Sequence, residues 1–167
     1  MPINIIVDGY NLIGSDAGLR GDFKRKRAEL IHELAQYQAR KSYPVTVVFD
    51  GWRSGWVHEI EERSEGILVI YSKRGEKADS VILRLARELG NGCVVVSSDR
   101  ELRNGVEACG AVAVYVSEFR PKLKNPDRAV FPEMEEGFRN SKGKGKKGNP
   151  NRLSKRARKR MGKLKKL

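Results

Sequence analysis

INIIVDGYNLIG, at residues 3–14, is the stretch that decides the fold. Its apolar run, interrupted only by Asn4, stops at Asp8, and Gly9 follows at once. A short run of β-branched residues is typical of a strand buried on both faces of a parallel sheet, and the glycine marks the turn. The pattern therefore predicts Asp8 at the carboxyl edge of the sheet, where open α/β folds bind ligands. Asn11 is expected in the turn beside it; alternatively, Asp8 and Asn11 only satisfy backbone donors.

The alternation of strands and helices continues to about residue 116. Four further apolar runs predict strands at 45–51, 67–72, 93–97 and 111–116. Apolar residues at helical spacing predict helices over 20–41, about 79–89 and about 100–109, with a brief helix near 117–123. The polar residues 52–66 are expected to form a loop. The predicted fold is a three-layer α/β/α domain with a mostly parallel central sheet of about five strands.

The positive charge is concentrated at one end of the chain. Of the 34 Lys and Arg residues, 20 lie in residues 1–138 and 14 in residues 139–167, whereas all 21 Asp and Glu residues precede residue 138. The first part is thus close to neutral and the second carries +14. The expected organisation is a domain over 1–124, a linker over 125–138 and a basic tail over 139–167.

The tail itself changes composition along its length. Residues 139–151 contain no apolar side chain and are expected to be disordered. Residues 152–167 carry scattered leucines among basic residues, which predicts a basic helix that orders only on a partner, because alone it is short and self-repelling. Such a polycation binds RNA largely without sequence preference.

The N-terminus lacks a signal peptide pattern, and no apolar stretch approaches the ~20 residues that span a bilayer. Cys93 and Cys109 lack metal-ligand spacing and are interpreted as reduced core thiols. These features predict a cytoplasmic protein without a membrane partner.

Acidic side chains recur at the same point of the predicted fold. Asp8, Asp50 and Asp99 each follow a strand, and Asp79 opens a helix that leaves the same edge. Because parallel strands end at one edge, these carboxylates are expected to converge, and they would have raised pKa values without a cation. Two of them also have local explanations: Asp79 suits a helix N-terminus, and Asp50 suits an Asp-Gly turn.

Oxygen ligands without a His or Cys cluster point to Mg²⁺ or Mn²⁺, which bind few carboxylates together with waters and substrate phosphate. Such a metal activates a water and neutralises charge at a scissile phosphate. We expect Asp8, Asp79 and Asp99 to be metal ligands, directly or through water, with Asp50 as a fourth candidate. The residues expected to orient ligands or a phosphate oxygen are Asn11 and Ser98.

The order and spacing of four segments resemble the NYN ribonuclease domain of the PIN-like nucleases, and most closely its bacterial YacP-like group. The segments are VDGYN at 7–11, VFDG at 48–51, GEKADS at 75–80 and VVSSDREL at 95–102. The resemblance covers about residues 3–120 and implies a metal-dependent endoribonuclease whose catalytic residues here are Asp8, Asn11, Asp79 and Asp99. The group includes a ribosome-associated enzyme that cleaves mRNA in the A site, which implies mRNA and the ribosome as partners.

Basic side chains near the predicted edge and in the tail are candidate RNA contacts: Lys24, Arg25, Arg27, Arg100, Arg103, Lys155, Arg156, Arg158, Lys159 and Arg160. Trp52 and Trp56 are expected either to cap the core or to stack on bases.

Two other function classes compete with the nuclease. A non-catalytic RNA-binding or ribosome-associated module would explain the tail but gains nothing from four carboxylates facing phosphates. A phosphohydrolase of haloacid dehalogenase type needs a second Asp two residues after the first, and that position holds Tyr10.

Overall fold

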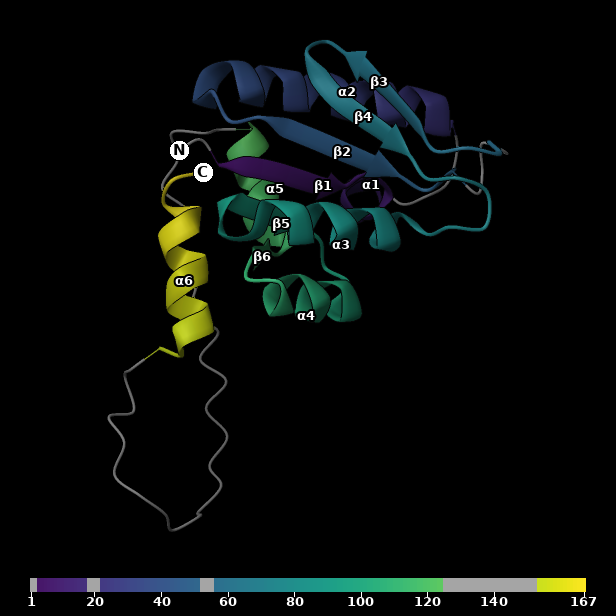
Figure 1. The fold of residues 1–167 in the computed structure, drawn as a ribbon. Helices are drawn as coiled ribbons and strands as arrows, with labels where there is room; N and C mark the ends of the chain where they lie inside the picture. The colour runs from purple at the N-terminus through teal and green to yellow at the C-terminus, as the bar shows by residue number, and fades with distance from the viewer. Residues whose placement is uncertain (1–2, 18–21, 52–55, 125–152) are drawn as a thin grey trace.

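The computed structural model describes residues 3–17, 22–51, 56–124 and 153–167 (Figure 1). Six strands form one sheet in the order β3-β4-β2-β1-β5-β6, in which only β3 is antiparallel to its neighbour. The strands are β1 Asn4–Asp8, β2 Val45–Phe49, β3 Ile60–Ser64, β4 Ile67–Tyr71, β5 Cys93–Val96 and β6 Val112–Val114. The helices are α1 Gly9–Ala17, α2 Phe23–Lys41, α3 Ala78–Leu89, α4 Arg100–Ala108, α5 Val116–Lys124 and α6 Lys155–Leu164, with a 3-10 turn at Gly90–Gly92.

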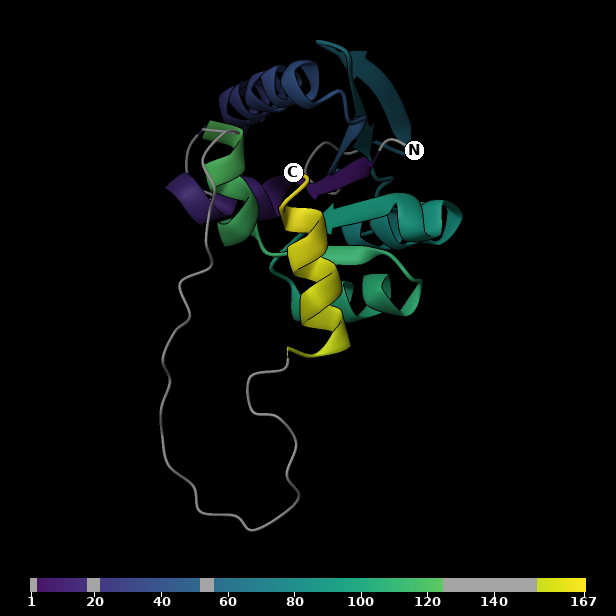
Figure 2. The ribbon, with the colours of Figure 1, turned by 90° about the vertical axis from the view of Figure 1, so that its left-hand side faces the viewer.

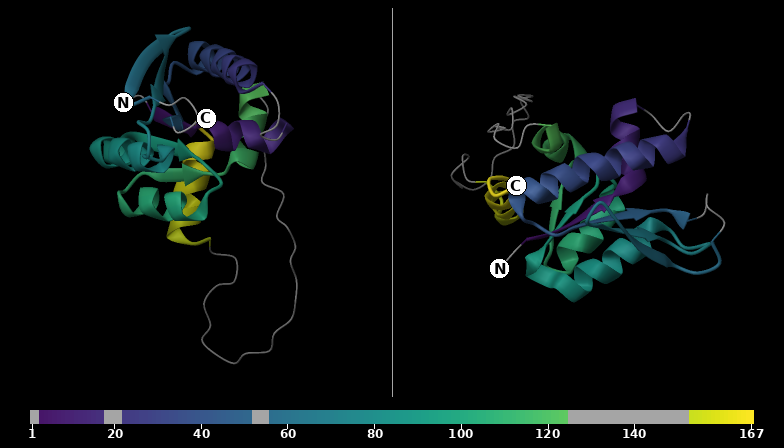
Figure 3. Two further views of the ribbon diagram at one scale, coloured as in Figure 1. Left: turned by 90° about the vertical axis from the view of Figure 1, so that its right-hand side faces the viewer. Right: turned by 90° about the horizontal axis from the view of Figure 1, so that it is seen from above.

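Alternate residues of each strand supply the two layers of the core. Ile5 and Val7 of β1 pack in the cluster that α1, α2 and α5 cover, whereas Ile6 packs in the cluster that α3 and α4 cover. Seen from above, α2 and α3 lie on opposite sides of the sheet (Figure 3, right). The predicted three-layer α/β/α class with a mostly parallel sheet is therefore confirmed. None of the helices in the described part of the chain has the length and apolar character needed to cross a membrane.

Two glycines at the carboxyl edge of the sheet explain the repeated Asp-Gly dipeptide. A Cβ atom on Gly9 would lie 2.3 Å from the ring of Phe49, and one on Gly51 would lie 1.4 Å from the carbonyl oxygen of Ser72. Neither neighbour has room to give way, since Phe49 and Ser72 are fully buried. The glycines thus allow the strand ends to pack closely around the aspartates that precede them.

The strand β3 lies inside the segment that the sequence predicts as a loop. It has no apolar alternation because it is the exposed edge of the sheet, with Glu61, Glu62 and Arg63 facing solvent. The signal for it lies in the turn: Glu65 and Gly66 both have positive φ, at 52° and 86°, which is the conformation of a two-residue hairpin.

A second difference concerns the residues after β1. The sequence predicts a turn there, but α1 begins at Gly9, so Asn11 lies in the first turn of a helix. Leu12 and Ile13 are buried in the core cluster of this face, and this burial holds the short helix in place.

The third difference concerns the basic C-terminal segment. Residues 155–164 form α6, which packs against β6 and runs across the direction of the strands (Figures 1 and 2). Leu167 is fully buried in the core cluster, and the Tyr37 hydroxyl donates a hydrogen bond to its carbonyl oxygen at 3.0 Å. The sequence predicts order here only on a partner, whereas the domain itself supplies the docking surface. The predicted linker at 125–138 and the predicted disorder of 139–151 lie outside the described residues.

Leu167→Ala is expected to lower the free energy of unfolding by about 2–4 kcal/mol, because it empties a filled core position. Leu153→Ala is the matched control: Leu153 precedes α6 and is 43% exposed, so its loss should cost less than about 0.5 kcal/mol. Urea titration of both variants measures the difference. Equal values would show that the segment after α6 does not belong to the core.

Candidate active site

Asp8 ends the central strand β1 and lies at the carboxyl edge of the sheet. Only 9% of its surface is exposed. Its carboxylate accepts a hydrogen bond from the Ser97 hydroxyl at 3.3 Å and another from the backbone N–H of Asn11. It takes part in no ion pair within the described residues. Asp8 is therefore a buried acid whose partners are neutral.

The other acids of this edge act on Asp8 and on each other. Burial first, and then the neighbouring charges of Asp79 and Asp99, raise the pKa of Asp8 from 3.8 to about 7, against the two hydrogen bonds that lower it. Burial also raises the pKa of Asp79, and the charges of Asp99 and Asp50 add to this while Lys77 opposes it. We call this group of four carboxylates, Asp8, Asp50, Asp79 and Asp99, the acidic edge.

Ser97 connects two members of the acidic edge, a role that the sequence did not assign to it. Its buried hydroxyl donates to Asp8 and accepts from the backbone N–H of Asp99 at 3.1 Å. The strand register explains the contact, because Val7 of β1 pairs with Val96 of β5, so that the next residues, Asp8 and Ser97, end side by side. A serine placed directly after a buried strand next to the Asp8 strand is the signal that could have found it.

Asn11 and Ser98 hold two loops of the edge together. The Asn11 side-chain oxygen accepts a hydrogen bond from the Ser98 backbone N–H at 2.9 Å, and the Ser98 hydroxyl accepts one from the Val116 N–H at 3.3 Å. Asn11 is thus a positioning residue that ties α1 to the segment carrying Asp99.

Asp99 caps a helix, whereas Asp79 lies in the first turn of one, where a carboxylate also suits the positive end of the helix dipole. Asp99 is the N-cap of α4, where its Oδ1 atom accepts from the Leu102 N–H at 3.0 Å. The N-cap of α3 is Lys77, which makes no side-chain cap, and Asp79 lies in the first turn beyond it. Asp79 is therefore not needed as a cap. Asp50 is half-buried after β2 and acts on the pKa of Asp79, which places it on the same edge.

The donor set of the acidic edge fits a hard divalent cation. The described residues contain no three His, Cys, Asp or Glu side chains already arranged to hold a metal ion together. Mg²⁺, however, usually takes one or two carboxylates and keeps several of its waters. Asp8 with Asp79 meets that need, because burial and neighbouring acids raise the pKa of both carboxyl groups, and the charge of Asp79 acts on Asp8.

Five of the candidate RNA contacts lie on α2 and α4. Lys24, Arg25 and Arg100 are exposed. Arg27 donates to the Tyr10 hydroxyl at 2.9 Å and lies 5.8 Å from the ring centre of Tyr71, so it is anchored beside the acidic edge.

Arg103 is the exception among these five. It is buried, donates to the Ser97 carbonyl at 3.2 Å and stacks on the ring of Tyr115 at 3.4 Å. These contacts give it a structural role under the edge, and the predicted phosphate contact of Arg103 stays a prediction.

The other five candidates lie on α6. Arg156 pairs with Glu107 and Arg160 with Glu118, both at 3.4 Å, and Lys159 donates to a backbone carbonyl at 2.7 Å. Lys155 and Arg158 are exposed. Of the two tryptophans, Trp56 is largely exposed and does not cap the core, and Trp52 lies outside the described residues.

Comparison with known proteins gives one consistent family. A model of the YacP-like NYN domain matches residues 5–166, which include α6. The chain is 35% identical over 133 residues to "Uncharacterized protein YacP" of Bacillus subtilis (strain 168), covering 75% of this chain and 78% of that protein. Two crystal structures of Rae1 (YacP) from Bacillus subtilis are similar in fold. That of the W164L mutant has a TM-score of 0.62 and 30% identity and covers 74% of this chain and 76% of its own. The other has a TM-score of 0.61 and 29% identity and covers 74% of each chain.

Asp8→Asn is expected to stabilise the metal-free protein at pH 8 but not at pH 4. The folded state keeps the Asp8 proton up to about pH 7, whereas the unfolded chain releases it near 3.8, so the wild type loses up to about 4 kcal/mol of stability as the pH rises between these values. The side-chain amide in Asp8→Asn carries no charge at any of these pH values, so the variant does not lose this stability. Unfolding titrations in chelator across this pH range measure the difference.

Asp22→Asn is the control for this series, because Asp22 is an exposed N-cap of α2 and its charge favours the helix. It should be neutral or slightly destabilising at pH 8. An Asp8→Asn effect that did not change with pH would contradict the buried charge.

Proposed function

We propose that this chain, which belongs to the YacP-like NYN domain family, is an endoribonuclease that depends on Mg²⁺ or Mn²⁺ and hydrolyses RNA phosphodiester bonds at the acidic edge. The observation that carries the proposal is Asp8, a carboxylate that is buried beside other acids and whose hydrogen-bond donors among the described residues are neutral. Keeping such a group at the carboxyl edge costs stability unless a cation binds there. A fold built only to bind RNA would have no use for it.

In the proposed reaction each residue has a defined part. Asp8 and Asp79 would hold the metal ion, and Asp99, whose charge acts on both of them, would be a further ligand directly or through water. Ser97 keeps the Asp8 carboxylate oriented, and Asn11 fixes the neighbouring loop. When bound, the metal ion supplies charge neutralisation at the scissile phosphate and a more acidic water.

More specifically, we propose that the substrate is mRNA on the ribosome, and this part of the proposal rests on the family resemblance. Exposed and anchored basic side chains next to the edge, such as Arg27 and Arg100, support an RNA backbone as the ligand. Such a substrate would place the protein's action in the cytoplasm.

One observation favours a second candidate function. Exposed basic side chains lie beside the acidic edge, such as Arg100 and Lys24, and they would also serve a non-catalytic RNA-binding module on the same fold, which is the alternative. The two candidates differ in whether RNA is cut.

Wild-type protein with Mn²⁺ or Mg²⁺ is expected to cleave an end-labelled RNA, and Asp8→Asn and Asp79→Asn should each lose on the order of 10²-fold or more in rate. EDTA should abolish cleavage. The matched control is Glu88→Gln on the exposed side of α3, which removes one negative charge away from the edge and should leave the rate unchanged. Gel analysis of the products measures the cleavage rate of the wild type, with and without EDTA, and of the three variants.

The same series is run on mRNA in translating ribosomes, because the proposed substrate is ribosome-bound. If neither naked nor ribosomal RNA is cut by the wild type while every variant binds RNA equally, the nuclease is refuted and the binding module stands. Equal cleavage by the wild type and Asp8→Asn would refute the assigned site.

A further inference from the structure

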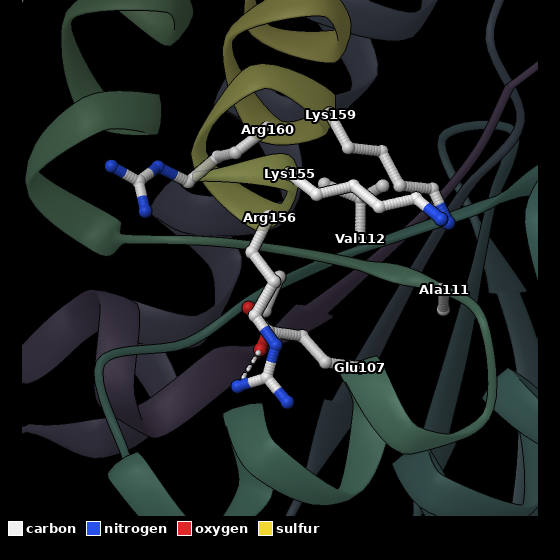
Figure 4. Close-up of a pocket in the computed structure, with 8 residues that line it drawn as sticks. Glu107, Ala111, Val112, Lys155, Arg156, Lys159 and Arg160 are labelled. Atoms are coloured by element: carbon white, nitrogen blue, oxygen red, sulfur yellow. Dashed lines mark ion pairs between the residues drawn. The ribbon is translucent and has the colours of Figure 1, made fainter. Parts of the chain in front are cut away.

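A cleft runs along the free edge of β6 between α4 and α6. It consists of two hollows, of about 530 Å³ and about 310 Å³, which share Glu107, Arg156 and Arg160 in their walls. The larger hollow begins at Ser98, the residue next to Asp99 of the acidic edge. The smaller hollow continues along Ala111, Val112 and Ala113 beneath α6 (Figure 4). We call the two together the basic groove.

The side chains that line the groove are strongly cationic. Among the described residues of the lining, six are basic and one, Glu107, is acidic. The basic ones come from two distant parts of the chain: Arg100, Arg103, Lys155, Arg156, Lys159 and Arg160. The groove exists only because α6 docks on the domain, so the basic segment contributes a shaped wall in addition to charge.

One ion pair crosses the groove where the hollows meet. Arg156 Nη1 lies 3.4 Å from Glu107 Oε2, and Figure 4 shows the two side chains reaching toward each other from α6 and α4. The Arg156 side chain is 77% exposed, so its attraction to Glu107 is weak and is easily exchanged for another anion. A phosphate entering the groove can therefore replace the carboxylate on Arg156.

The geometry points to a single RNA strand as the occupant: we propose that its phosphate backbone lies in the basic groove, with Arg156 released from Glu107 to bind it. This inference rests on the proposed function of the acidic edge and adds the path of the strand that reaches it. A ligand that spans from the acidic edge past Ser98 to Arg156 must carry negative charges repeated along its length, as a nucleic acid does. Two hollows of about 530 Å³ and about 310 Å³ are too small to enclose a duplex, so we infer a single strand.

The test measures binding, separately from cleavage. Each variant also carries Asp8→Asn and is kept in EDTA so that RNA is not cut. The binding of a fluorescent single-stranded oligoribonucleotide is then measured at several salt concentrations. Arg156→Ala should weaken binding by about fivefold or more and reduce the slope of log affinity against log salt by ~0.7, as expected for the loss of one phosphate contact on a single strand.

Arg158→Ala is the matched control. Arg158 lies on the same helix and carries the same charge, but it is exposed and is not part of either hollow wall. Its loss should change the affinity by less than about twofold. Equal losses for Arg156→Ala and Arg158→Ala would overturn the groove, because they would mean that α6 acts only as a diffuse polycation.

Glu107→Gln tests the exchange in the opposite direction. Freeing Arg156 should raise the affinity by about two- to fivefold, whereas Glu88→Gln on α3 removes the same charge elsewhere and should leave it unchanged. An unchanged affinity in Glu107→Gln would overturn the competition between carboxylate and phosphate. If a duplex of the same length bound equally well and was equally sensitive to Arg156→Ala, the proposal that the groove takes a single strand would be refuted.

The two proposals fail separately. If the wild type does not cut RNA but binding depends on Arg156 and not on Arg158, the proposed nuclease activity is refuted and the proposed RNA path through the groove is supported. If the wild type cuts RNA but Arg156→Ala and Arg158→Ala weaken binding equally, only the proposed RNA path through the groove is refuted.

Discussion

The position of one carboxylate, Asp8, governs the rest of this structure. It lies at the end of the central strand with almost no access to water, so its charge is opposed by burial and by the acids around it. Within the described part of the chain, two hydrogen bonds oppose that cost, one from the Ser97 hydroxyl and one from the Asn11 backbone. Gly9 gives the chain the close packing on Phe49 that holds the site in place.

Two electrostatic environments of opposite sign meet at Ser98. On one side lies the acidic edge, whose members raise each other's pKa values and which favours a cation. On the other side lies the basic groove, whose lining favours a polyanion. In the proposed function, a divalent metal ion held by the carboxylates would neutralise the phosphodiester charge, so metal and RNA together would suit both environments.

Much of this arrangement was predictable from the sequence for a simple physical reason. Parallel strands end at one edge, so an acid at the end of a buried apolar run is placed by topology alone, as with Asp8 and Asp50. The strand β3 was not predictable from hydrophobicity, because an exposed edge strand has no buried face to leave a pattern. Its hairpin turn at Glu65 and Gly66 was the remaining signal.

The roles of charged side chains were harder to predict because they depend on tertiary contacts. Arg103 has the charge expected of a phosphate contact, but its side chain is buried against Tyr115. The basic segment has a net charge that opposes folding on its own, and its order comes from Leu167 in the core and from acids on other elements, such as Glu107. Composition shows the charge of a segment, whereas only the fold shows which neighbours neutralise it.

The titration of Asp8, followed by carboxyl-carbon NMR without and with Mg²⁺, tests the central claim most directly. The account predicts a pKa of about 7 in the metal-free protein and a fall toward or below the ordinary 3.8 when Mg²⁺ is added. A metal-free pKa near 3.8 that does not respond to Mg²⁺ would contradict it.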